Sequence, residues 1–96
     1  MNFLHYELTA GPDDLIETKL DAAANVRLLD QANYNRYRRS ESHTYIGGYV
    51  KVSPYLVKPP RYDKWHVVVD LGGGAGSVNA SVRVLPHAAK TGARLG

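Results

Sequence analysis

Residues 65–85, WHVVVDLGGGAGSVNASVRVL, constrain the fold of this chain more than any other stretch. Apolar side chains alternate with more polar ones along both halves of it, and this period of two is typical of half-buried β-strands. Four glycines lie between the halves: Gly72, Gly73, Gly74 and Gly76. Glycine adopts positive φ without steric cost, so the run predicts a structural turn. We therefore predict a β-hairpin with strands at 65–71 and 78–85.

Short runs with the same period continue through the rest of the chain. We predict further strands at residues 2–8, 15–20, 25–29, 43–52 and 55–58. The prolines that flank 55–58 place this strand at a sheet edge, because proline has no amide hydrogen to donate. Gly47 and Gly48 predict a bulge or a close backbone approach inside 43–52. A helix over residues 13–29 is the alternative for that segment, although its β-branched side chains favour extended chain.

Residues 30–39, DQANYNRYRR, carry the signals of one short helix. Asp30 is of a type that caps a helix N-terminus, and the arginines at the other end suit the negative end of the helix dipole. Tyr34, Tyr37 and Arg38 have the spacing i, i+3 and i+4, which places them on one helix face.

Many short strands with glycine and proline turns, together with a single short helix, predict an all-β fold. We favour a small, jelly-roll-like β-sandwich, and an OB-type barrel is the alternative. The expected core consists of Leu4, Tyr6, Ile16, Leu20, Val26, Leu28, Val67, Val69, Val82 and Val84. Residues 1–85 are expected to form a single domain, and residues 86–96 a basic, disordered C-terminal tail.

Composition excludes some classes of protein. The chain has no cysteine, so neither disulfides nor thiolate metal sites hold it together, and we expect a cytoplasmic location. No stretch approaches the ~20 apolar residues of a membrane span, so no membrane association is expected. The formal net charge of +3 is modest and comes partly from the tail, so it says little about partners.

The segment Asp70-Leu71-Gly72-Gly73-Gly74 resembles the phosphate loop of the actin, sugar-kinase and heat-shock chaperone ATPases. That fold clamps its nucleotide between two large domains, which a single domain of this length does not supply. A P-loop or dinucleotide site would need a helix directly after the glycines, and here a strand follows. We therefore interpret the glycines as a structural turn, with nucleotide binding at this turn as an alternative.

No set of residues in the sequence points to catalysis, a metal or a cofactor. The four histidines lie on different predicted elements, without the close spacing that places two ligands on one face. His66 and Asp70 share a strand face but are roughly 13 Å apart along the strand, too far for a base and its orienting carboxylate. No nucleophile elbow occurs. We expect a protein that is not an enzyme.

The candidate binding site is the helical segment, where tyrosine rings and arginine cations alternate. Its residues are Asn33, Tyr34, Arg36, Tyr37, Arg38 and Arg39. This mixture suits a non-catalytic interaction with an unknown protein or small ligand, and single-stranded nucleic acid is the alternative. A purely structural interpretation is that both tyrosines pack the helix onto the sandwich while the arginines stay in water. An edge strand could also pair two copies of the chain into a homo-oligomer.

Nearly the whole chain up to Leu85 resembles the bacterial DUF1883 family. The resemblance is carried by MNFLHYEL at the start, ANV with LLD at 24–30, NY at 33–34, YRR at 37–39, GG at 47–48, SP at 53–54 and WHVVVDLGG at 65–73. It implies an all-β domain of unknown biochemical function, found alone or beside Toll/interleukin-receptor-like domains. This association implies a sensing or interaction module, and it brings no catalytic residues.

Overall fold

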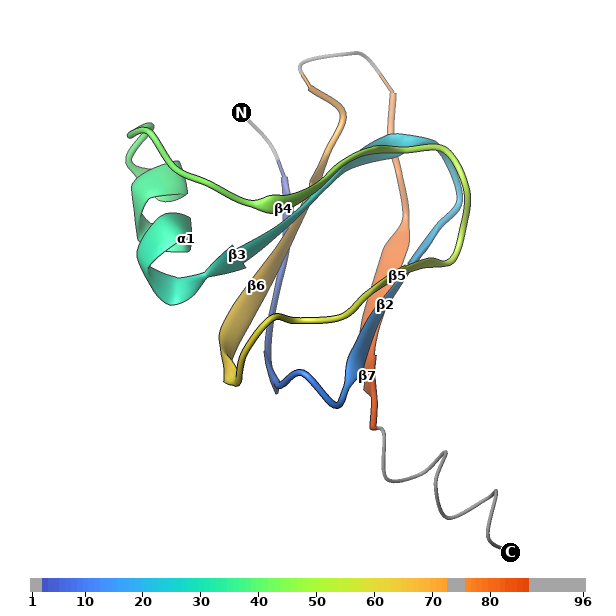
Figure 1. Ribbon diagram of the computed structural model, residues 1–96. Helices are drawn as coiled ribbons and strands as arrows, with labels where there is room; N and C mark the ends of the chain where they lie inside the picture. The colour runs from blue at the N-terminus through green and yellow to red at the C-terminus, as the bar shows by residue number, and fades with distance from the viewer. Residues whose placement is uncertain (1–2, 73–75, 87–96) are drawn as a thin grey trace, which may run out of the picture.

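The computed structural model describes residues 3–72 and 76–86 and shows two antiparallel sheets packed face to face, with one helix (Figure 1). In chain order the elements are β1 (Leu4–Ala10), β2 (Leu15–Leu20), β3 (Ala24–Asp30), α1 (Gln31–Arg38), β4 (Ile46–Val50), β5 (Tyr55–Val57), β6 (Asp63–Asp70) and β7 (Ala80–Leu85). The predicted β-sandwich is confirmed, and the sheets do not close into a barrel. Residues 15–20 and 24–30 are strands rather than parts of one helix.

The two sheets have the strand orders β1-β6-β3-β4 and β5-β2-β7. The predicted hairpin at 65–85 is therefore wrong, because β6 pairs with β1 and β3 while β7 pairs with β2 in the other sheet. The strands that precede and follow the glycines thus belong to different sheets. A period of two shows which face of a strand is buried but not which strand pairs with it.

The core lies between the sheets and contains most of the residues expected there. Five of the predicted residues are buried: Ile16, Val26, Leu28, Val67 and Val69. Four more are partly buried and pack against them: Tyr6, Leu20, Val82 and Val84. Leu4 is the exception, with 37% of its surface exposed. It is the first residue of β1. Its place in the alternating pattern was correct, but at the end of the strand this did not ensure burial.

The predictions at the sheet edges were largely correct. β5 is an edge strand, as its flanking prolines indicated. β4 is shorter than expected, at five residues, and pairs with β3. Gly47 has φ +127°, and a Cβ there would lie 2.2 Å from the carbonyl oxygen of Val26. The backbones of β3 and β4 thus approach so closely that only glycine fits at this position.

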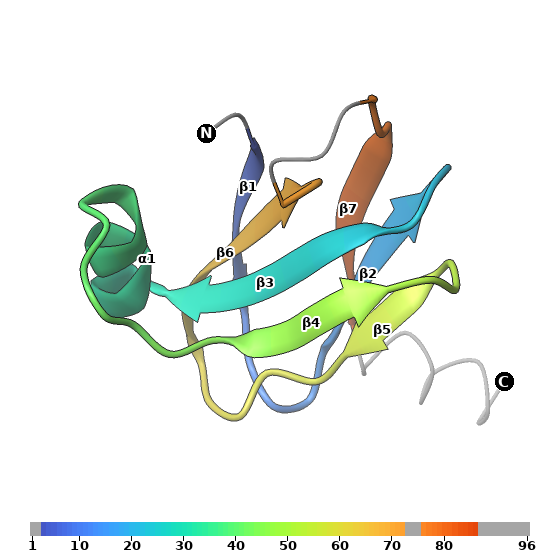
Figure 2. The ribbon, with the colours of Figure 1, turned by 90° about the horizontal axis from the view of Figure 1, so that it is seen from above.

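Helix α1 follows β3 directly and lies at one end of the four-stranded sheet (Figures 1 and 2). As predicted, Asp30 is its N-cap, and one carboxylate oxygen accepts a hydrogen bond from the Asn33 amide at 2.8 Å. The helix packs against β3 and β6, on the sheet face opposite the core. No helix in the described part of the chain has the length and hydrophobicity that crossing a membrane requires.

Candidate functional site: helix α1 and the sheet beneath it

The two tyrosines of α1 hold the helix against the sheet. Tyr34 is 8% exposed and packs with Leu29 and Val68 in a small apolar cluster, which Tyr37 borders. The Tyr37 ring also makes edge-to-face contacts with Phe3 and His43, at centroid distances of 5.3 Å each. Both rings thus perform the packing role that the structural interpretation assigned to them, and neither offers an open stacking face like that of a single-strand binder.

Beneath Tyr34, the structure brings together two histidines that are 61 residues apart in sequence. His5 Nε2 lies 2.8 Å from His66 Nδ1, and the two rings are nearly coplanar, with an interplanar angle of 15°. The Tyr34 ring stacks on both imidazoles, at 4.3 Å from His5 and 4.2 Å from His66. The two histidines lie on different strands, as predicted, and their sequence spacing did not suggest this contact.

Hydrogen bonds extend the imidazole pair into helix α1 at both ends. His66 Nε2 lies 2.8 Å from Gln31 Oε1, and the Tyr34 hydroxyl lies 3.2 Å from His5 Nδ1. If His66 donates to Gln31, then His5 donates to His66 and Tyr34 donates to His5. All four ring nitrogens then have a partner while both imidazoles are neutral.

Burial favours the neutral form of both rings. It lowers the pKa of His66 below 6.5, and the neighbouring His5 lowers it further. His5 is largely exposed, and the partial desolvation of its ring lowers its pKa too, although Glu7 opposes this effect. A buried imidazolium loses hydration that neutral hydrogen bonds do not replace, so burial of His66 favours the neutral form of its ring.

A second polar cluster lies farther along the same sheet face. The Asp70 carboxylate is buried and accepts hydrogen bonds from Arg27, from Asn25 at 3.0 Å and from the Gly72 amide at 2.7 Å. The Arg27 guanidinium lies near the rings of Tyr37 and Tyr45, at 5.8 and 5.3 Å from their centroids. Asp70 therefore anchors the start of the glycine turn and is not free to act as a base.

The arginines at the C-terminal end of α1 are in contact with water. Arg36, Arg38 and Arg39 are exposed, and within the described residues only Arg39 has an ion pair, with Glu41 at 3.2 Å. The Arg38 guanidinium lies 5.5 Å from the Tyr34 ring centroid. Asn33 has a structural role, because its side-chain oxygen accepts a hydrogen bond from the Thr44 amide at 3.0 Å and its side-chain nitrogen donates to Asp30. The candidate residues thus separate into packing residues and three exposed arginines at the end of α1, Arg36, Arg38 and the C-cap Arg39, whose exposed surface we call the arginine face.

The glycine turn is described only at its two ends. Gly72 and Gly76 have φ of +65° and +117°, which are the positive values predicted for glycines in a turn. Gly73 and Gly74 lie outside the described residues. A Cβ on Gly72 would lie 2.9 Å from Nδ2 of Asn25, so the turn starts tightly against β3.

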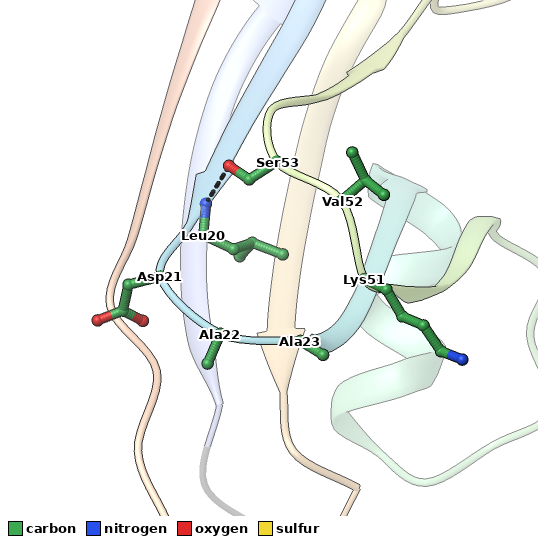
Figure 3. A pocket seen from close by; sticks show the side chains of 7 residues that line it. All are labelled: Leu20, Asp21, Ala22, Ala23, Lys51, Val52 and Ser53. Atoms are coloured by element: carbon green, nitrogen blue, oxygen red, sulfur yellow. Dashed lines mark hydrogen bonds between the residues drawn. The ribbon is translucent and has the colours of Figure 1, made fainter.

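A small pocket of about 120 Å³ lies between the turn at 20–23 and residues 51–53 (Figure 3). Ser53 Oγ accepts a hydrogen bond from the Leu20 amide at 2.9 Å. The side chains of Asp21 and Lys51 extend away from each other (Figure 3). The pocket therefore has little volume and no converging polar groups to orient a ligand.

Histidine and carboxylate side chains do not form a metal centre in this arrangement. Among residues 3–72 and 76–86, no three His, Cys, Asp or Glu side chains are grouped so that they could hold a metal ion. The nearest carboxylate to the imidazole pair is Glu7, whose Oε1 lies 4.0 Å from His66 Nδ1.

The comparison with protein families agrees with the fold and with the resemblance noted in the sequence. A family described as "Domain of unknown function (DUF1883)" matches residues 1–88. The chain belongs to the DUF1883 family. The match to DUF1883 extends three residues beyond Leu85 and includes every described strand and α1. No curated protein and no solved structure matches the chain significantly.

Proposed function

We propose that this chain is a non-catalytic binding domain that recognises an acidic segment of a partner protein through the arginine face of α1. One observation carries the proposal. The helix is held by Tyr34 and Tyr37, so its arginines project from a fixed support, and Arg36 and Arg38 have no ion pair within the described chain. Guanidinium groups bind carboxylates with two parallel hydrogen bonds, and a fixed helix backbone lowers the entropic cost of presenting them together.

Single-stranded nucleic acid is the second candidate, supported by the same three cations. We favour the acidic protein because binding to single strands also uses aromatic rings on which bases stack. In this domain the Tyr34 ring is covered by both histidines and the Tyr37 ring is packed against its neighbours.

The test compares two labelled probes of similar charge: a glutamate-rich peptide and a mixed-sequence single-stranded oligonucleotide. Fluorescence anisotropy is measured at two salt concentrations. We expect the wild type to bind the peptide, and a variant with Arg36, Arg38 and Arg39 all changed to alanine to lose binding. The matched control changes exposed Lys19, Lys51 and Lys58 to alanine, which removes the same charge elsewhere and should leave binding nearly unchanged.

Other outcomes reject the proposal in distinguishable ways. Binding of the oligonucleotide with a slope of log affinity against log salt of about −2, lost in the arginine variant, would identify a nucleic-acid binder with three phosphate contacts. Equal losses in the arginine and lysine variants would mean that net charge, rather than the arginine face, attracts the probe. Absence of binding to both probes would show that the face does not recognise anionic chains.

A further inference from the structure

The contact between His5 and His66 limits how many protons the pair can hold. The two facing nitrogens are 2.8 Å apart, so a single hydrogen lies between them. The hydrogen-bond chain from Tyr34 to Gln31 can run in either direction, because a hydroxyl rotates and an amide can flip. In both directions the two facing nitrogens share one proton.

A first additional proton fits this arrangement. Placed on His5 Nδ1, it meets the Tyr34 hydroxyl, which turns and accepts it at the observed 3.2 Å. A second additional proton does not fit. It would set two N–H groups head-on across 2.8 Å and place two cationic rings with their centroids 5.0 Å apart.

We propose that α1 is a pH-sensitive element, docked on the sheet while the imidazole pair holds at most one additional proton and released when both rings are protonated. The groups that enclose the pair explain why the helix responds. Gln31 and Tyr34, both on α1, cover His66, which is only 1% exposed. At Nε2 and over the ring face, a protonated His66 gains water when these two side chains move away, and they move with α1.

The charges around the imidazole pair have opposing effects on its protonation, so burial determines the direction in which the pKa values shift. From β1, Glu7 favours protonation, but its carboxylate is also paired with Lys64 of β6 at 3.6 Å. Asp63 at the start of β6 favours protonation of His66, whereas Lys64 opposes it, and Arg38 on α1 opposes protonation of His5. From β3, apolar Leu29 is the register partner of His66, and Asp30 is engaged by the helix cap and by Arg61.

The direction of the pH effect follows from the lowered pKa of both histidines. A group whose pKa is lower in the docked state stabilises docking above its ordinary value and loses that contribution as the pH falls. The contribution of the pair to docking is therefore fully present above pH 6.5 and is lost as the pH falls toward the lower pKa values of the docked state.

Hydrogen exchange of individual amides tests the proposal. The protection of the α1 amides, corrected for the intrinsic exchange rate, should stay constant from pH 7.5 to 6.5. From pH 6.5 to 4.5 it should fall by up to about tenfold per pH unit for each proton taken up on release. The amides of β6 should keep their protection. The variant His66→Gln can accept from His5 and donate to Gln31 at every pH, so its α1 protection should stay constant. The matched control His43→Gln, in the segment after α1, should behave like the wild type.

Four outcomes would overturn the proposal: constant α1 protection in the wild type, an unchanged transition in His66→Gln, loss of the transition in His43→Gln, or equal loss of β6 protection. The last would show that acid unfolds the whole domain instead of releasing the helix. If His66→Gln does not fold, His5→Gln is the second test. Glutamine can present its carbonyl to a protonated His66, so the transition should move to lower pH, and an unchanged midpoint contradicts the proposal.

Discussion

At the residue scale, Gly47 and Gly48 are adjacent in β4 but differ in what surrounds them. Both have φ in the region that favours glycine, at +127° and +157°. A Cβ on Gly47 would lie 2.2 Å from the Val26 carbonyl oxygen, whereas a Cβ on Gly48 would meet nothing within 4 Å. The first glycine is therefore required by a neighbouring backbone, and the second only by its own conformation.

We predict that Gly47→Ala lowers the free energy of unfolding by more than ~3 kcal/mol, because backbone strain is combined with a clash that the β3 backbone cannot relieve. Gly48→Ala should cost only the strain, about 1–3 kcal/mol. Urea unfolding followed by the fluorescence of Trp65 measures both. Equal costs for the two variants would show that the close approach does not constrain β4.

Two of the predicted core valines differ in how completely they are buried. Val69 is 1% exposed between the sheets, whereas Val82 is only partly buried. Val69→Ala should lower the free energy of unfolding by about 2–3 kcal/mol and Val82→Ala by about 1 kcal/mol, because a cavity is left only where the surroundings are closed. Chemical denaturation checks this order, and a larger cost at Val82 would contradict the assignment of the core.

At the element scale, α1 depends on the residue that precedes it. Asp30 is partly buried, which raises the pKa of its carboxyl, but hydrogen bonds from the Asn33 amide and from Arg61 outweigh this effect and leave the pKa lowered. The cap therefore stabilises the helix above pH 3.8, the ordinary value, and this contribution is lost as the pH falls through the lower folded-state pKa.

Asp30→Ala should cost about 1 kcal/mol and increase hydrogen exchange in the first turn of α1. Asp30→Asn keeps a side-chain oxygen that caps the helix and loses only the charge paired with the half-exposed Arg61, so its cost should be a few tenths of a kcal/mol. If the two substitutions cost the same, the ion pair rather than the cap stabilises this end of the helix.

At the scale of the whole molecule, stability should fall in two stages on acidification. The pKa values of His5 and His66 are lowered, so their contribution begins to be lost below pH 6.5. Hydrogen bonds from Arg83 lower the pKa of Glu17, and those from Asn79 lower the pKa of Asp21, so these carboxylates lose their contribution only below pH 4.5 and 3.8. Urea midpoints measured between pH 8 and 3 check this profile. A midpoint that rises on acidification would contradict it.

The sequence by itself determined the secondary structure, because the signals for strands, caps and edges are local. The period of two located every strand, Asp30 marked the start of the helix, and prolines placed β5 at an edge. The fold class followed from these elements. The pattern of tyrosines and arginines at 33–39 was also visible in the sequence. The sequence did not show that the rings face the sheet while the cations face water.

Only the tertiary structure decided which strands pair and which polar side chains meet. Alternation marks a face but names no partner, so the β6–β7 hairpin was wrong, and β6 instead lies between β1 and β3. That placement brings His66 beside His5 and sets Asp70 against Arg27, contacts that join positions 61 and 43 residues apart. Such contacts depend on the register between paired strands. The packing of complete sheet faces determines that register, and no short stretch of sequence encodes it.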